Sequence, residues 1–203
     1  MRAIGVVIGA IIAGLCVSGC SAGESSPPPV TSATASSSQP VPAGLAPPRQ
    51  APEINGPLIE FDPCTNINKA LLVSVGLAGA KIQRSDRMGS PTSSLGCIFT
   101  GGDKLISVFS GNEAFVDQLD RDRALRTGPP AQLITINGRE AFTGPNRIGD
   151  QNCTVVMRTD FGHVYVDGGY IVNRAEFQRR QLNTCAEILR IATLLEPLLP
   201  KGH

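Results

Sequence analysis

The sequence CTVVMRTDFGHVYVD, residues 153–167, predicts two β-strands joined by a short turn. Cys153–Thr159 and His163–Asp167 are rich in β-branched and aromatic residues, and Asp160-Phe161-Gly162 between them has the composition of a turn. The stretch therefore predicts a β-hairpin.

Two other segments repeat this pattern. Asn137-Gly138 is the strongest short hairpin signal in the chain, because both residues tolerate the positive φ of a two-residue turn. Gly101-Gly102-Asp103 likewise separates two apolar runs. Besides the two strands above, the predicted strands are 80–84, 96–100, 104–110, 132–136 and 139–143.

Helix signals flank these strands. Asp62-Pro63 is a helix start, and Gly76 is placed to end that helix. The polar stretch Asn112–Leu125 predicts a second helix, with Phe115 and Leu119 as its apolar contacts.

A last helix has one apolar face, formed by Cys185, Ile188, Leu189, Ala192 and Leu195. Two capping boxes leave its start open, one at Asn173 and one at Thr184, and Pro197 and Pro200 end it. Helices at both ends of a series of hairpins predict an α+β fold, with an antiparallel sheet packed by N- and C-terminal helices.

The N-terminus predicts a lipoprotein signal peptide over residues 1–19. Ile4–Cys16 is apolar and uncharged but too short to span a bilayer as a mature helix. Val17-Ser18-Gly19-Cys20 then resembles the lipobox of bacterial lipoproteins, which implies that Cys20 is lipidated. An ordinary secretory signal and a transmembrane anchor are the alternatives.

Residues 20–57 are rich in Ser, Pro, Ala and Thr and predict a disordered tether. Residues 58–203 have a normal length for one domain with its own core. The organisation expected is therefore a signal peptide, a lipid-bearing tether and one folded domain.

Four cysteines remain for the domain: Cys64, Cys97, Cys153 and Cys185. An even number in an oxidising compartment predicts two disulfides. A metal site is the weaker alternative, because no two of these cysteines lie two to four residues apart. Three connectivities are possible. We favour the sequential one, which joins a helix to a strand in each half.

Several stretches together resemble actinobacterial, mainly mycobacterial, lipoproteins of the Lpr type that carry a four-cysteine domain of unknown function. These stretches are FDPCTNINKALLVSVGL, LGCIFTGG, ITINGREAF, QNCTVVMRTD and NTCAEILRIATLLEPLLP. The resemblance covers residues 58–200 and implies an envelope lipoprotein without an assigned activity. Many relatives have Trp where this chain has Phe99, for which we expect a core role.

Candidate catalytic groups are sparse. His163 alternates with Val164 and Val166, so we expect it on the opposite, solvated face of its strand. Asp117, Asp120 and Asp122 interleave with Arg121, Arg123 and Arg126, which favours a mutually neutralising helix face over a catalytic carboxylate pair. Asp150, Asp160 and Asp167 lie at expected strand ends and could converge. Arg174, Arg179 and Arg180 are expected on a surface helix face.

A net charge of +1 and the absence of a basic stripe argue against nucleic-acid binding. The leading hypothesis is a non-enzymatic binding or accessory lipoprotein on the outer side of the cell membrane, with an envelope lipid, glycan or protein as partner and without metal or cofactor. A sensor or structural spacer is the alternative. A third is a hydrolase or transferase, which needs Asp and Ser side chains, with or without His163, to meet in a cleft.

Overall fold

The computed structural model describes residues 41–51, 56–126, 128–145 and 151–201. The expected signal peptide, the lipidated Cys20, most of the expected tether, Asp150 and His203 lie outside these residues. Within the same ranges, no helix is long and apolar enough to cross a bilayer.

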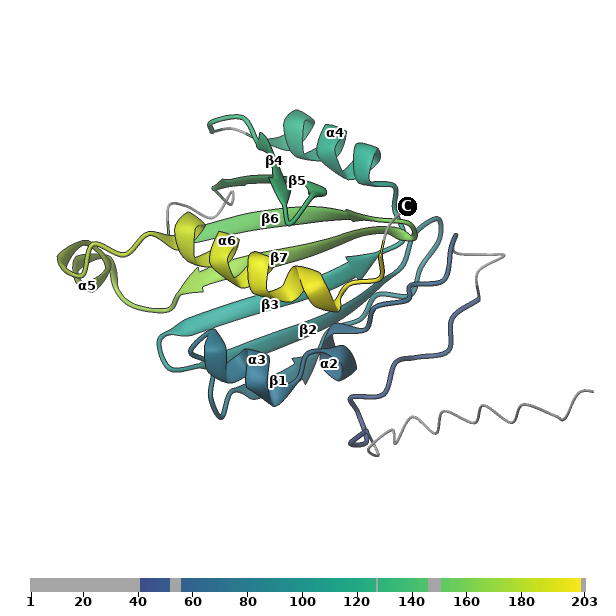
Figure 1. Ribbon diagram of the computed structural model, residues 1–203, viewed down its shortest axis with the longest axis horizontal. Coiled ribbons are helices and arrows are strands. Elements are labelled where there is room, and N and C mark those ends of the chain that lie inside the picture. The colour runs from purple at the N-terminus through teal and green to yellow at the C-terminus, as the bar shows by residue number, and fades with distance from the viewer. Residues whose placement is uncertain (1–40, 52–55, 127, 146–150, 202–203) are drawn as a thin grey trace, which may run out of the picture. The chain divides into compact units, whose positions relative to one another are not determined.

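In the described part of the chain, seven strands form one antiparallel sheet in the order β1-β2-β3-β7-β6-β5-β4 (Figure 1). Its strands are β1 Lys81–Arg84, β2 Ser94–Gly101, β3 Lys104–Gly111, β4 Gln132–Ile136, β5 Arg139–Pro145, β6 Asn152–Thr159 and β7 Gly162–Tyr170. Every neighbouring pair is consecutive in sequence except β3 and β7, which join the two halves of the domain. The predicted hairpins and the α+β class are confirmed.

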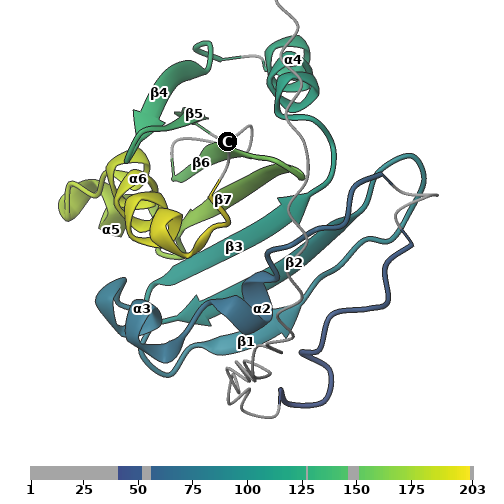
Figure 2. The same ribbon diagram turned by 45° about the vertical axis from the view of Figure 1, so that its right-hand side comes forward.

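The helices are α2 Pro63–Asn66, α3 Lys69–Ser74, α4 Phe115–Leu125, α5 Arg174–Arg179 and α6 Thr184–Leu195, followed by the 3-10 helix η1 Glu196–Leu198. In Figure 2, α2, α3 and α6 lie along the sheet, while α4 lies apart from them, beside β5 and β6. Helices therefore pack on both faces of the sheet, α2, α3 and α6 on one face and α4 on the other.

Strand register decides which residues meet which helices. Val155 and Met157 on β6 enter the main core, which they form with the inward residues of the other strands and with α2, α3 and α6. Val156 between them points to the opposite face, where it packs with Phe115, Leu119 and Phe142 in a second apolar cluster under α4. Two disulfides staple the main core, Cys64–Cys97 between α2 and β2 and Cys153–Cys185 between β6 and α6. The sequential pairing is confirmed.

The hairpin turn at Asn137-Gly138 takes the conformation that its sequence predicts. Asn137 has φ 50° and Gly138 has φ 91°, the two positive values of a type I′ turn. Phe99 is fully buried in the main core, which confirms the core role expected for it.

The expected single helix after Asp62 is wrong, because the chain forms α2 and α3 with a break at Ile67. Asp62 caps α2 through a hydrogen bond from the Cys64 N–H. Asn68 then caps α3 by accepting from the Leu71 N–H, while Ile67 is extended with ψ 114°. A second Asx cap inside the apolar pattern starts a new helix instead of continuing the first.

A separate helix begins at each of the two proposed starts of the last helix, α5 after Asn173 and α6 at Thr184. Asn173 caps α5 through the Glu176 N–H. The cap of α6 is Asn183 rather than the expected Thr184, because the Asn183 side chain accepts from the Ala186 N–H. Thr184 itself is the first residue of the helix.

Part of the segment expected as tether contacts the domain. Leu45 packs at the edge of the main core, and its carbonyl oxygen accepts a hydrogen bond from the Arg84 guanidinium. The Gln50 side chain bonds both the N–H and the C=O of Ile59. The contacts of the folded unit therefore begin before residue 58.

Candidate functional site

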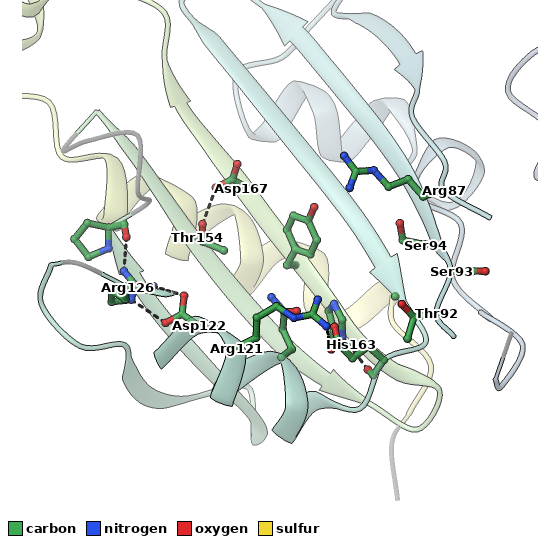
Figure 3. Close-up of a pocket in the computed structure, with 15 residues that line it drawn as sticks. Arg87, Thr92, Ser93, Ser94, Arg121, Asp122, Arg126, Thr154, His163 and Asp167 are labelled. Carbon is green, nitrogen blue, oxygen red and sulfur yellow. Dashed lines mark hydrogen bonds and ion pairs between the residues drawn. The ribbon is translucent and has the colours of Figure 1, made fainter. Parts of the chain in front are cut away.

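A pocket of about 550 Å³ lies between α4 and the sheet, on the face opposite the main core (Figure 3). We call it the α4 pocket. Its helix wall is formed by Gln118, Arg121, Asp122 and Arg126, its loop wall by Arg87, Thr92, Ser93 and Ser94, and its floor by Thr154, His163, Tyr165 and Asp167. Gly111, Glu113 and Pro145 complete the lining.

Alternation along β7 supplies the floor. Val164 and Val166 enter the main core, so His163, Tyr165 and Asp167 face the pocket. The Tyr165 ring stacks on Phe109 of β3, with 4.9 Å between ring centroids. Asp167 accepts a hydrogen bond of 2.6 Å from the Thr154 hydroxyl of β6. The floor thus combines an aromatic platform with a fixed carboxylate.

The Tyr165 hydroxyl is held in its neutral form. Burial raises its pKa to about 12, Asp167 adds to that shift, and Arg87 opposes it. Within the described residues the hydroxyl makes no hydrogen bond, although it lines the pocket. It is therefore a donor available to a molecule that enters.

The expectation that His163 is solvated is wrong. It does point away from Val164 and Val166, but it is only 4% exposed and its Nδ1 lies 3.0 Å from the Glu113 carbonyl oxygen. Burial lowers its pKa; the Glu113 contact opposes this shift, and Arg121 adds to it. The chain between β3 and α4 covers this end of the sheet, which strand alternation alone does not reveal.

The helix wall carries paired charges. Asp122 and Arg126 form a two-bond ion pair, with Nε to Oδ2 at 2.8 Å and Nη2 to Oδ1 at 2.6 Å. Arg121 pairs with Glu113. On the outer side of α4, exposed Asp120 and Arg123 pair at 3.2 Å. Of the three carboxylates in the predicted neutralising set, Asp120 and Asp122 pair with arginines of that set. Asp122 and Arg126 are partly buried at the pocket instead of solvated.

The loop wall contains a third arginine, Arg87. The Arg87 backbone is fixed by two hydrogen bonds with Ser94, N to O at 2.8 Å and O to N at 2.7 Å. In the part of the chain that the structure describes, its guanidinium has no ion pair or hydrogen bond. Figure 3 shows the Arg87 side chain extending from the loop wall toward the strands of the floor, and its charge acts on the Tyr165 hydroxyl.

The remaining candidates do not meet at this site. Asp167 lines the α4 pocket, Asp160 lines a second pocket of about 660 Å³ beside β5, β6 and η1, and Asp150 lies outside the described residues. Arg179 and Arg180 lie on or next to α5, paired with Glu176 and Asp103. Arg174 begins α5. Among the described residues, no three His, Cys, Asp or Glu side chains are grouped so as to hold a metal ion.

Arg87, Gln118 and Tyr165 are lining residues that sequence reasoning missed. A signal was present: Phe142 and Val156 are apolar at positions that face away from the main core, so strands β5 and β6 need cover on both faces. That cover is α4, and the pocket lies beside it, with residues of β2, β3, β6 and β7 in its lining.

Comparison with known proteins gives a family but no activity. Residues 15–198 match the family described as "Protein of unknown function (DUF3558)". No curated protein and no solved structure matches the chain. The match spans nearly the whole sequence, including all four disulfide cysteines, and the chain therefore belongs to the DUF3558 family.

Proposed function

We propose that this protein is a lipid-anchored lipoprotein of the cell envelope, similar to the Lpr type, whose α4 pocket binds a glycan-type ligand without turning it over. The observation that carries the binding role is the α4 pocket, with its polar walls and its aromatic floor. The lipobox-like Val17-Ser18-Gly19-Cys20 supports the anchor. The two disulfides support a compartment outside the cytosol.

The lining favours a polar ligand over an acyl chain. Apart from Gly111, Pro145 and Tyr165, every residue around the pocket has a polar or charged side chain. An acyl chain would leave these groups without hydrogen bonds in a site that it had emptied of water, at a cost of about 1 to 3 kcal/mol for each group. A ligand with many hydroxyl groups replaces those water contacts.

The floor favours a sugar among polar ligands. A sugar ring has apolar C–H faces and a polar rim, so it suits a site that offers an aromatic ring beside donors and acceptors. The Tyr165 ring, stiffened by its stacking on Phe109, supplies that surface. Gln118, Asp167 and the Asp122–Arg126 pair supply the polar contacts.

The states of the ionisable side chains in the pocket favour binding over catalysis. His163 is buried against a backbone carbonyl, and its lowered pKa favours the neutral ring. Asp122 and Glu113 are ion-paired with arginines, a state that suits fixed acceptors better than a general acid. The pocket also counts against a bare structural spacer, which needs no concave site.

The test of binding uses the full-length lipidated chain in detergent micelles, presented to an array of soluble envelope-glycan fragments. We expect retention of a glycan class and a loss of about tenfold in affinity for Tyr165→Ala, which removes the stacking surface. Tyr170→Ala, on the same strand but outside the pocket, should keep wild-type affinity. Gln118→Ala should also weaken binding. Because the Gln118 side chain makes no hydrogen bond to a described residue, the substitution removes no hydrogen bond that stabilises the fold. The proposal would be overturned if the protein retained no glycan, or if all variants bound the glycan equally.

The test of the anchor compares the wild type with Cys20→Ala in a bacterial host that processes lipoproteins. We expect the wild type in the detergent phase after phase separation and the variant in the aqueous phase, because two or more acyl chains hold a protein at a membrane. Mass spectrometry of the N-terminal peptide should show a diacylglyceryl group on Cys20. An unmodified Cys20 peptide would rule the anchor out.

A further inference from the structure

We propose that the ligand of the α4 pocket is acidic, and that Arg87 together with the Tyr165 hydroxyl binds its phosphate or carboxylate group. This inference rests on the proposed function, because it concerns the same pocket and narrows the ligand class from glycans to acidic glycans.

The first argument is the pairing of charges around the pocket. Three arginines line it, and two of them are matched by a carboxylate, Arg121 by Glu113 and Arg126 by Asp122. Arg126 also donates to the Pro145 carbonyl oxygen. Arg87 is the remaining one, and its guanidinium has no partner among the described residues. A guanidinium with all its donors available is suited to an anion with two oxygens.

The second argument is that the Arg87 backbone is fixed, although its guanidinium has no partner among the described residues. Its backbone is fixed in both directions to Ser94. Its charge acts on the Tyr165 hydroxyl, where it opposes the effect of Asp167. Figure 3 shows Arg87 on the loop wall and Asp167 on the floor, apart from each other. The pocket therefore has a cationic end at Arg87 and an acceptor end at Asp167.

The third argument is the set of hydroxyl groups at the cationic end. Within the described ranges, the Thr92, Ser94 and Tyr165 hydroxyls make no side-chain hydrogen bond, and all three line the pocket. Together with Arg87 they can donate to the oxygens of one anionic group. Asp167 at the other end can accept from ring hydroxyls but repels anions. An acidic sugar that lies across Tyr165 satisfies both ends at once.

The test titrates the full-length lipidated chain in detergent micelles with glucose 6-phosphate, glucuronate and glucose by isothermal titration calorimetry. We expect at least one acidic sugar to bind about tenfold more tightly than glucose, the scale of a charge-assisted contact. The phosphate and carboxylate probes distinguish the two possible sources of the anion. Added salt should weaken the acidic probe and leave glucose nearly unchanged.

Two charge-matched variants locate the effect. Arg87→Gln should abolish the preference for the acidic sugar, so that this variant binds the acidic sugar and glucose with equal affinity. Arg123→Gln removes the same charge from the exposed side of α4 and should keep the preference. Equal affinity of the wild type for glucose and both acidic sugars would overturn the inference, as would a preference that survives Arg87→Gln. Absence of acidic-sugar binding would overturn it too, while retention of a neutral glycan would still leave the proposed function standing.

Discussion

Two side chains on the floor of the α4 pocket, His163 and Tyr165, have shifted pKa values because the fold removes them from water. Burial lowers the pKa of His163 and raises that of Tyr165 to about 12. Both shifts favour the neutral form, because burial is the largest cause of each and outweighs the opposing contributions of Glu113 and Arg87. Each gives a measurable consequence.

His163 predicts a loss of stability in mild acid. Its folded pKa lies below its unfolded value near 6.5, so the unfolded chain binds the proton first. Its contribution to stability is present above the unfolded pKa and is lost as the pH falls through the folded pKa. Urea midpoints measured from about pH 7.5 to 5.5 should therefore fall more steeply for wild type than for His163→Gln. His203→Gln is the control and should keep the wild-type slope. Equal slopes for wild type and His163→Gln would contradict the prediction.

Tyr165 predicts a late component in an absorbance titration of phenolate. The chain has two tyrosines and no tryptophan, so the signal is simple to assign. Burial also raises the pKa of Tyr170, and the Tyr165 transition should lie at about 12. Tyr165→Phe should remove that late component. Arg87→Gln should move it to still higher pH, because Arg87 lowers this pKa. No change in Arg87→Gln would mean that Arg87 is not directed at the hydroxyl.

At the scale of elements, α4 depends on a small apolar cluster of its own. Phe115 is 2% exposed and packs at 5.6 Å from the Phe142 ring of β5, with the Arg158 guanidinium 4.6 Å from its ring centroid. The outer face of α4 is charged and contributes little to its attachment. The position of the helix wall of the pocket therefore rests largely on Phe115.

We expect Phe115→Ala to lower the free energy of unfolding by about 3 to 5 kcal/mol. The same variant should increase amide hydrogen exchange across α4 and weaken ligand binding, while the strands β1 and β2 keep their protection. Val116→Ala is the matched control, since Val116 is 49% exposed on the same helix, and it should change stability by less than about 0.5 kcal/mol. If exchange rises equally across the whole sheet, α4 is not an independent element.

At the scale of the whole domain, one sheet is assembled from two disulfide-closed halves. Cys64–Cys97 closes the half that contains β1 and β2, and Cys153–Cys185 closes the half that contains β6 and β7. Pairing of β3 with β7 joins the halves. The separations are 33 and 32 residues, so each cross-link removes a similar amount of entropy from the unfolded chain.

Replacing either pair with serine should therefore cost about 3 to 4 kcal/mol, measured by urea unfolding under oxidising conditions. Replacing both pairs should cost roughly the sum if the halves act independently. Non-reducing peptide mapping should link the Cys64 fragment to the Cys97 fragment. A Cys64–Cys153 or Cys64–Cys185 link would contradict the fold itself.

Sequence alone was enough for the strands, the hairpin turns, the helical regions and the α+β class, but not for the number of helices. These depend on local signals such as Asn137-Gly138, Asp62-Pro63 and period-two alternation, which act within a few residues. Local reasoning failed at Ile67, where a second cap competes with helix continuation, and at the start of α6, where two adjacent residues could both cap.

The α4 pocket could not be predicted from local sequence signals, because its residues come from parts of the chain that are far apart. Arg87, Gln118 and Tyr165 belong to a loop, a helix and a strand, and only the β3–β7 pairing and the packing of α4 on Phe142 bring them around one space. The burial of His163 has the same origin. Alternation along a strand states which face a side chain occupies, but the cover over that face depends on where a distant helix packs. Long-range packing of α4, rather than any local motif, therefore creates the candidate site.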